Sequence, residues 1–320
     1  MKQNNRIKFF LLSGILLFSI ILGITKGSVD LSLRELLLEQ NRHILLLRLL
    51  RVALAIIAGS GLAACGITLQ AILRNPLAEP YLLGTSSGAG LGAVAAIIFG
   101  ALNIYLPLAA FAGASLTVVL VYLLARQDNK IEIQSLILAG VVVSVALSGI
   151  IVFLVSFYDN KALHGILWWL WGSLQVYDIK LLGTISILVI GGIIFIYTLS
   201  QDLNALSLGE EEAIHLGVDA ETIKKYLFLV TSLITAGIVC ICGIIGFVGL
   251  IIPHATRYLV GPNHRVLIPA ACVAASAFMI LCDLISRTLT PPFEIPIGVI
   301  TACIGAPLFI ALLKAKEKIK

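Results

Sequence analysis

The sequence predicts an all-α protein that crosses a membrane about ten times, as a single transmembrane domain over residues 1–320. Hydrophobic residues make up 59% of the chain, charged residues only 12%, and the mean hydropathy is +1.06. Apolar runs of roughly 18 or more residues recur along the chain, and a run of that length can cross the hydrocarbon core as a helix. These observations favour a polytopic membrane protein.

Ten apolar segments are expected to form the spans, near 7–25, 48–70, 82–99, 105–124, 132–156, 181–199, 226–246, 247–261, 268–286 and 297–313. The eighth is short for a span. The first follows a basic patch of Lys2, Arg6 and Lys8, as a secretory signal does, but it ends without a small-residue cleavage pattern. We therefore expect an uncleaved first span.

The distribution of Lys and Arg predicts the orientation of these spans. With both chain ends in the cytoplasm, 14 of the 22 Lys and Arg residues fall on the inner side. The outer side keeps Lys26, Arg34, Arg42, Arg48, Arg51, Lys161, Lys180 and Arg287. This bias follows the positive-inside rule and places the polar loop 201–226 in the cytoplasm. A nine-span alternative would leave the lysine-rich C-terminal tail outside.

Small residues predict close packing of the spans. Gly84, Gly88 and Gly92 fall at four-residue spacing on one face of the third span, and Ala270 and Ala274 share a face of the ninth. In lipid, such faces allow two helix backbones to approach closely. A compact bundle is expected.

The loop 201–226 is expected to form two short helices joined by a tight turn. Ser207 and Glu210 have the spacing of a capping box. Gly217 supplies a left-handed residue that ends the first helix, and Asp219 caps the second.

Three consecutive carboxylates, at residues 210–212, make the first of these short helices acidic. The anionic inner leaflet would repel them, so a protein partner matches this helix better than a lipid surface does. By residue type alone, a solvated loop between two spans is the alternative.

Two arginines stand at the outer mouth of the second span. Arg48 and Arg51 are three residues apart and therefore share one helical face. They could reach lipid headgroups, or they could dock acidic residues of a soluble partner through bidentate pairs. Another outer segment, 164–174, contains three tryptophans and is expected to form a short helix lying flat on the outer face.

Several kinds of site are missing from the sequence. It contains no Gly-x-x-x-x-Gly-Lys-Ser/Thr loop, so the chain cannot bind a nucleotide in the P-loop manner, and if it took part in ATP-driven transport a second subunit would have to supply the ATPase. The basic residues sit at loop ends rather than in a stripe, which argues against nucleic-acid binding. The cysteines lie in apolar stretches without metal-ligand spacing, and we expect core residues rather than disulfides or a metal site. They are Cys65, Cys240, Cys242, Cys272, Cys282 and Cys303.

His254 and Asp283 are the candidates for acid–base chemistry within the membrane. Pairing with Arg257 or Arg287 is the simpler explanation for both of them. The spans are otherwise nearly free of ionisable residues, which argues against a proton or sodium relay. A secondary transporter and an intramembrane enzyme are kept as alternatives, and each would act without ATP.

A series of motifs occurs in order along the chain. They are Arg48-Leu-Leu-Arg51, Gly61-Leu-Ala-Ala-Cys-Gly66, Gln70 with Arg74-Asn-Pro-Leu-Ala-Glu-Pro80, Gly209-Glu210 with Leu216-Gly217, Gly246-Phe-Val-Gly-Leu-Ile-Ile-Pro-His254 with Arg257, Asp283 with Arg287, and Glu294-Ile-Pro-Ile-Gly298. With these motifs the chain resembles the FecCD family of ABC importer permeases, over nearly its whole length. It departs from the family at Leu50, where a proline is frequent.

This resemblance implies a ten-span subunit in a bacterial cytoplasmic membrane, paired with a second copy or a paralogue. Two cytoplasmic ATPases would use ATP and Mg beneath it, and a soluble binding protein would dock outside. The chain itself would bind no cofactor or metal and would not be an enzyme. The family carries iron–siderophore chelates, haem and cobalamin, and a ferric siderophore is the first expectation for the cargo.

The resemblance also implies roles for particular residues. The ATPase-coupling helix would contain Ser207, Gly209, Glu210, Ala213, Leu216 and Gly217. The residues that dock the binding protein would be Arg48, Arg51 and Arg287. Residues of structural importance or on the translocation path would be Asn75, Pro76, Gly84, Pro253, His254 and Arg257. Irregular, buried backbone is expected at both proline sites.

Overall fold

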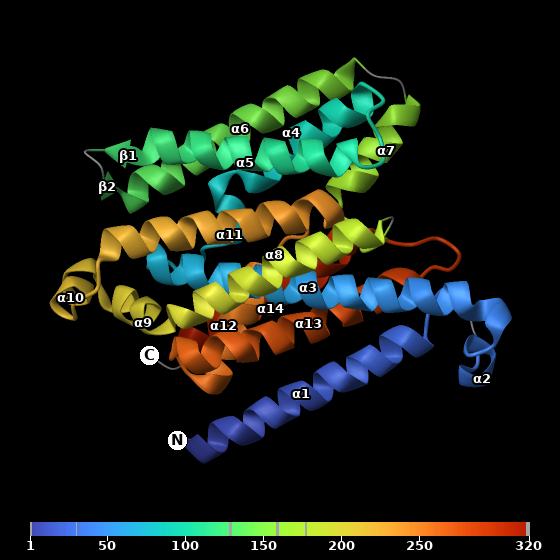
Figure 1. Cartoon of the computed structure of the whole chain (residues 1–320), viewed down its shortest axis with the longest axis horizontal. Helices are drawn as coiled ribbons and strands as arrows, with labels where there is room; N and C mark the ends of the chain where they lie inside the picture. Colours follow the sequence, from blue (N-terminus) through green and yellow to red (C-terminus); the bar gives the residue numbers. More distant parts are fainter. Residues whose placement is uncertain (1, 30, 128–129, 158–159, 177, 318–320) are drawn as a thin grey trace.

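The chain is almost entirely helical in a computed structural model that describes residues 2–29, 31–127, 130–157, 160–176 and 178–317. Its long helices run side by side along one axis (Figure 1). The start of α1 and the end of α14 lie at the same end of the bundle as α9 and α10, whereas α2 and α7 lie at the opposite end (Figure 1). This arrangement fits an even number of crossings. Which end faces the cytoplasm stays a prediction.

Seven helices among the described residues are long and apolar enough to cross a membrane. They are α1 (Lys2–Thr25), α3 (Arg42–Ile72), α5 (Tyr105–Ala125), α6 (Ile133–Ser156), α8 (Ile179–Thr198), α11 (Ala220–Cys242) and α13 (His264–Thr288). The three other expected spans correspond to α4 (Thr85–Ile98), α12 (Val248–Val260) and α14 (Ile297–Glu317). The helices α4 and α12 are shorter than predicted, because left-handed residues adjoin them: Gly84 before α4, and Phe247 and Gly261 around α12.

Shorter elements connect these helices. They are α2 (Leu33–Leu36), α7 (Asn160–Leu170), α9 (Ser200–Leu208), α10 (Glu210–His215), two 3-10 helices (Glu39–Asn41 and Pro80–Leu83), and the antiparallel pair β1 (Arg126–Gln127) and β2 (Lys130–Ile131). The tryptophan-rich segment is helical as expected, but its helix begins and ends earlier than predicted. Figure 1 shows α7 across the end of the bundle opposite α10.

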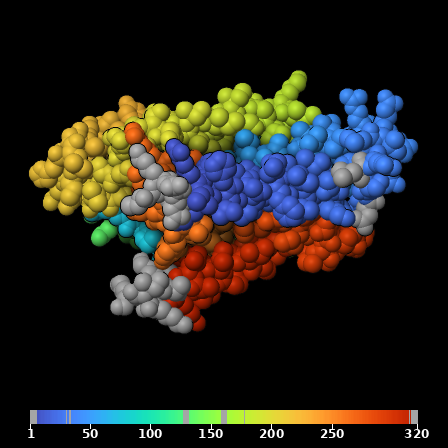
Figure 2. Space-filling model, turned by 90° about the horizontal axis from the view of Figure 1, so that it is seen from below, coloured from blue at the N-terminus to red at the C-terminus, as the bar shows by residue number. Residues whose placement is uncertain are grey.

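The helix α3 forms the centre of the bundle. In the most apolar stretch of α3, 83% of the residues are buried. The corresponding share for α1 is 11%, and α1 lies along the outside of the bundle (Figure 2). A side chain at Gly66 would overlap the backbone of Gly249, so only glycine lets α3 and α12 approach this closely. The same holds for α4 against α5, where Gly88 and Gly92 contact backbone atoms of Gly113 and Ala109. The predicted small-residue face is thereby confirmed for these two glycines. Gly84 precedes the helix instead.

The backbone is irregular between α11 and α12, and side chains from a distant loop satisfy it. The carboxylate of Glu79 accepts a hydrogen bond from the Phe247 amide (2.7 Å), and the Tyr81 hydroxyl accepts one from the Ile245 amide (3.2 Å). A broken helix is tolerated in a membrane protein when neighbouring groups take up its free N–H groups. Glu79 is therefore an ionisable residue within the bundle that the sequence reading overlooked.

The predicted irregular backbone is present at one proline site and absent at the other. Asn75 forms a turn in which its side chain accepts from the Leu77 amide (2.9 Å), but Pro76 beside it is exposed rather than buried. Pro253 lies inside the regular helix α12. A proline cannot donate to the carbonyl four residues earlier, here that of Gly249, and the Gln70 amide donates to that oxygen instead (3.5 Å).

Candidate functional site

The first candidate site is the segment 200–219, which contains α9 and α10 and protrudes at one end of the bundle (Figure 1). Ser207 lies within α9, where its hydroxyl donates to the Leu203 carbonyl (2.7 Å), so the predicted capping box with Glu210 is wrong. The helix breaks two residues later, at Gly209, whose φ of 155° and ψ of 161° suit glycine alone. Local spacing could not reveal that α9 continues through Ser207.

The predicted end of α10 is confirmed. Gly217 is left-handed, with φ +82°, and its amide donates to the Ile214 carbonyl (2.9 Å). The Val218 amide donates to the Ala213 carbonyl (2.9 Å), which completes a Schellman motif. Asp219 caps α11 by accepting from the Thr222 amide (3.1 Å), and its hydrogen bonds with Thr222 lower the pKa of the carboxyl group.

A buried lysine attaches α10 to α11. The Lys224 side chain is only 2% exposed, and its Nζ lies 3.1 Å from Glu210 Oε1 and 2.5 Å from Glu221 Oε1. Ala213, on the inner face of α10, is fully buried. The helix is therefore fixed to the bundle by one apolar contact and one ion-pair cluster.

The outward side of this segment is apolar. Leu208, Ile214 and Leu216 are 68%, 62% and 65% exposed. Exposed apolar side chains next to charged ones are typical of protein interaction sites. The segment thus presents both a fixed position and a surface that a second protein could cover.

Replacing Gly217 with valine is expected to lower coupled transport more than expression. A β-branched residue is disfavoured at this positive φ, at a cost of about 1–2 kcal/mol, and would tilt α10 without touching the core. Uptake and the amount of membrane-inserted protein would be measured together. Gly183→Val in α8 is the matched control, because that glycine also faces open space but has no positive φ. Equal losses of uptake and expression would contradict a role in coupling.

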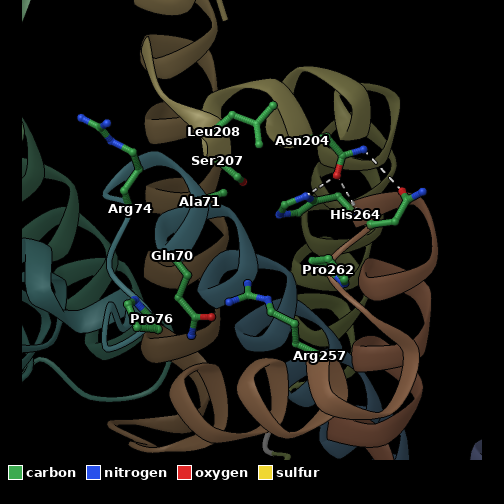
Figure 3. Close-up of a pocket in the computed structure, with 11 residues that line it drawn as sticks. Gln70, Ala71, Arg74, Pro76, Asn204, Ser207, Leu208, Arg257, Pro262 and His264 are labelled. Atoms are coloured by element: carbon green, nitrogen blue, oxygen red, sulfur yellow. Dashed lines mark hydrogen bonds between the residues drawn. The ribbon is translucent and has the colours of Figure 1, made fainter. Parts of the chain in front are cut away.

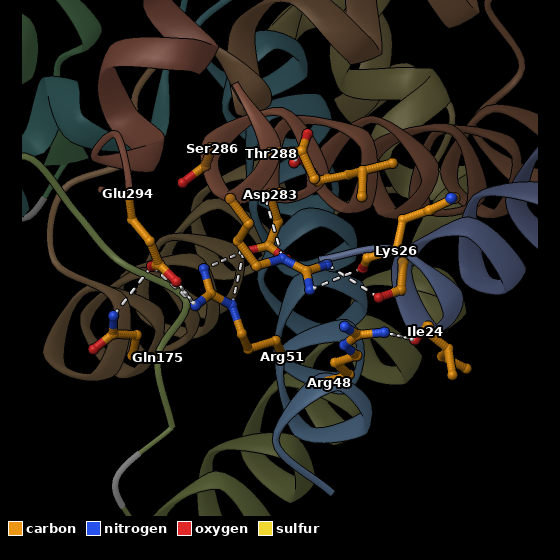
Figure 4. A network of polar contacts seen from close by, with 12 residues as sticks. Ile24, Lys26, Arg48, Arg51, Gln175, Asp283, Ser286, Thr288 and Glu294 are labelled. Carbon is orange, nitrogen blue, oxygen red and sulfur yellow. Dashed lines mark hydrogen bonds and ion pairs between the residues drawn. The ribbon is translucent and has the colours of Figure 1, made fainter. Parts of the chain in front are cut away.

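The second candidate site is a polar network at the other end of the bundle (Figure 4). The guanidinium of Arg51 lies between two carboxylates, 2.7 Å from Asp283 and 2.8 Å from Glu294. Arg287 pairs with the other oxygen of Asp283 (2.9 Å), and Gln175 donates to Glu294 (3.1 Å). The simpler explanation for Asp283, an ion pair with Arg287, is confirmed.

Arg48 and Arg287 hold the end of α1. Arg48 donates to the carbonyls of Ile24 (3.0 Å), Thr25 (2.9 Å) and Val29, and Arg287 donates to those of Gly23 (3.0 Å) and Lys26. Carbonyls at a helix C-terminus lack partners within the helix, and cations stabilise them. These two arginines therefore join α1 to α3 and α13.

The three arginines expected to dock a binding protein are largely buried in the structure. Arg48 and Arg287 are 4% and 3% exposed, and the Arg51 side chain is 11% exposed. Carbonyls and carboxylates distant in sequence therefore already contact all three guanidinium groups in the single chain. Docking of a binding protein by these residues stays a prediction.

The structure does not bring His254 and Asp283 together. The ring of His254 packs against Tyr258 and Phe309, with centroids 5.2 and 6.1 Å apart. His254 lies at the middle of α12, whereas Asp283 lies in the last two turns of α13, at the end of that helix remote from the turn that joins α12 to α13. The intramembrane enzyme gains no support from this geometry.

The cysteines are unpaired thiols in this structure. Four of them are buried as predicted, but Cys303 in α14 is exposed, so its expected place in the core is wrong for the single chain. Within the part of the chain that the structure describes, no group of three metal-ligating side chains meets.

The fold and these sites describe a multi-span membrane protein with a protruding, anchored polar segment. The chain belongs to the FecCD transport family, whose model matches residues 15–315. A solved structure described as an inward-facing conformation of a protein assigned to the metal-chelate type of ABC transporters is 34% identical, with a TM-score of 0.87 over 97% of this chain and 99% of that one. The FecCD-type permease fold is thereby confirmed.

Curated relatives carry several names. The cobalamin import system permease protein BtuC of Halobacterium salinarum is 39% identical over 85% of this chain and 73% of its own length. The Fe(3+)-citrate import system permease protein YfmE of Bacillus subtilis is 39% identical, over 85% and 81%. The hemin transport system permease protein HmuU of Yersinia pestis is 33% identical, over 97% of both chains. The similarity thus spans permeases named for different cargoes.

Proposed function

We propose that this chain is the permease subunit of an ATP-driven importer that moves an iron(III)–siderophore complex across the cytoplasmic membrane. The observation that carries the proposal is the similarity to FecCD permeases along nearly the whole chain. The structural relative named for metal chelates and the relative named for ferric citrate support an iron chelate as cargo. Cobalamin or haem is the alternative, supported by the relatives named for those ligands.

The absence of a nucleotide-binding loop and the exposed surface of α10 support the partners that we propose for this chain. Its sequence has no P-loop, so ATP and Mg would be used by a pair of cytoplasmic ATPase subunits. The exposed α10, with Glu211 and Ile214 on its surface, supports contact with those subunits. A soluble binding protein would deliver the cargo on the outer side. A second permease copy, or a paralogue, would complete the translocation path.

Transport would proceed by alternating access driven through α10. ATP binding closes the ATPase dimer, and α10 moves with it as a rigid body. Lys224 transmits this movement to α11, because it ties Glu210 to that helix. Gly209 and Gly217 bound the moving unit, and the long helices rock to expose the path alternately to each side. The permease needs little affinity for the cargo, since the binding protein raises its local concentration.

The cargo is tested by uptake into proteoliposomes that hold this chain with its co-purified ATPase. Equal concentrations of labelled ferric siderophore, ferric citrate, cobalamin and haem would be offered in parallel, each with the cognate binding protein. We expect ATP-dependent uptake of the ferric siderophore at least tenfold above the others. Uptake of cobalamin or haem instead would overturn the siderophore assignment while retaining the importer.

A further inference from the structure

A charged cavity lies beside the segment 200–219, and the transport mechanism proposed above assigns it no role. It measures about 480 Å³ and is open on one side (Figure 3). Its walls are the end of α3, the helix α9, and the segment that joins α12 to α13. It therefore lies at the same end of the bundle as α10.

The cavity is positively charged. Arg257 and Arg74 line it, although the Arg74 side chain points away from the other lining residues in Figure 3, and the lining contains no carboxylate. Arg257 is partly buried, and it takes part in none of the ion pairs among the described residues. Burying a guanidinium without an anion is unfavourable, because the charge loses hydration and gains no partner. The site is complementary to an acidic group.

Two buried acceptors in the wall also lack donors. Asn204 Oδ1 accepts from the His264 amide (3.0 Å) and from its Nδ1 (2.7 Å), so the proton of the neutral ring is on Nδ1 and Nε2 is an acceptor. His264 Nε2 and Gln70 Oε1 receive no hydrogen bond within the described chain, and the two residues are 3% and 4% exposed. In Figure 3 the ends of the Gln70 and Arg257 side chains face one another, and the His264 ring lies above them, beside Asn204.

We propose that this cavity receives an acidic side chain from a loop of the cytoplasmic ATPase. The carboxylate pairs with Arg257, and neighbouring hydroxyl or amide N–H groups of the same loop donate to Gln70 and His264. This inference rests on the proposed function, and it adds a second attachment point to α10. The ATPase would thereby contact α3 and α12 directly, as well as α10.

Position and size favour a protein loop over a free anion. The helix α9 forms one wall and continues through Gly209 into α10, and Leu208, which borders the cavity, is 68% exposed. The surface expected to contact the ATPase is therefore continuous with the cavity. A small oxyanion would fill little of 480 Å³ and would leave the two acceptors short of donors.

The test uses the complete permease–ATPase complex with Arg257→Lys. A carbodiimide joins an amine to a contacting carboxylate as an amide, and the water lost in this condensation converts the carbodiimide to a urea. We expect a permease–ATPase adduct through residue 257, located by mass spectrometry, at least tenfold above that of Arg265→Lys. Arg265 is the matched control, because it is exposed on neighbouring α13 and lies outside the cavity lining.

A second variant keeps the test decisive if lysine does not reach the partner. With Arg257→Gln, the ATPase should dissociate at a lower salt concentration than in the wild type, whereas Arg265→Gln should match the wild type. An absent adduct together with unchanged salt dependence would overturn the inference. So would Arg257-dependent binding of inorganic phosphate to the permease in the intact complex. If the wild-type chain binds no ATPase at all, the proposed function itself fails.

Discussion

Replacing Lys224 with methionine is expected to lower ATP-driven uptake about tenfold while leaving the protein folded. A loss of about 1.4 kcal/mol lies between the usual values for an exposed and a buried ion pair, and it corresponds to about a tenfold change. Methionine fills the buried volume of the lysine stem but cannot hold Glu210. That carboxylate is 36% exposed and can be hydrated, so the cost falls on the position of α10 rather than on folding.

The measurement compares uptake with ATP hydrolysis in the same proteoliposomes. We expect Lys224→Met to retain ATPase activity and lose transport, since α10 no longer moves α11. Lys224→Arg should restore part of the uptake. Lys225→Met is the control, because Lys225 is the next residue and lies outside the ion-pair cluster. Wild-type uptake by Lys224→Met would show that this attachment is not needed for coupling.

Replacing Asp283 with asparagine is expected to destabilise the protein by about 3–5 kcal/mol, the usual cost of removing one partner from a buried ion pair. Asp283 is 1% exposed and is shared by Arg51 and Arg287. Without its charge, Arg287 would lose its ion pair, and Arg51 would keep only the one with Glu294, which is itself 22% exposed. The end of α1 would loosen with them, because Arg287 also holds its carbonyls.

Thermal unfolding in detergent measures this effect. The unfolding temperature of Asp283→Asn should fall well below that of the wild type, whereas Glu211→Gln on the exposed face of α10 should leave it unchanged. The double variant Asp283→Asn with Arg287→Gln should recover part of the loss, since it removes an unpaired charge along with its partner. An unchanged unfolding temperature for Asp283→Asn would refute the structural role of the network.

The class of fold and the positions of the long apolar helices could be predicted from the sequence because they depend on composition and local pattern. Long apolar runs mark the spans, and Gly217 and Asp219 mark helix ends through local backbone geometry. The predicted capping box at Ser207 was wrong because it too rested on local pattern alone. The same local pattern is compatible with a helix that continues through Ser207, and only the structure shows α9 ending at Gly209.

The polar sites could be predicted only in part, because their partners are distant in sequence. The contact of Lys224 with Glu221 follows from their spacing of three residues, but its contact with Glu210 depends on how α10 folds back. Arg51 meets Asp283 and Glu294 more than 230 residues away. The position of the arginines at the mouth of a span therefore carries no information about the internal carboxylates that contact Arg51.

In the proposed mechanism, this chain transports its cargo only when a cytoplasmic ATPase drives it through α10. Uptake of the cargo identified above is the most direct test, measured with ATP, with a non-hydrolysable ATP analogue, and without the ATPase. We expect uptake only with ATP, and its loss when residues 210–217 are scrambled in a chain that still inserts into the membrane. Uptake by the chain without ATPase and ATP would contradict the account and favour a secondary transporter.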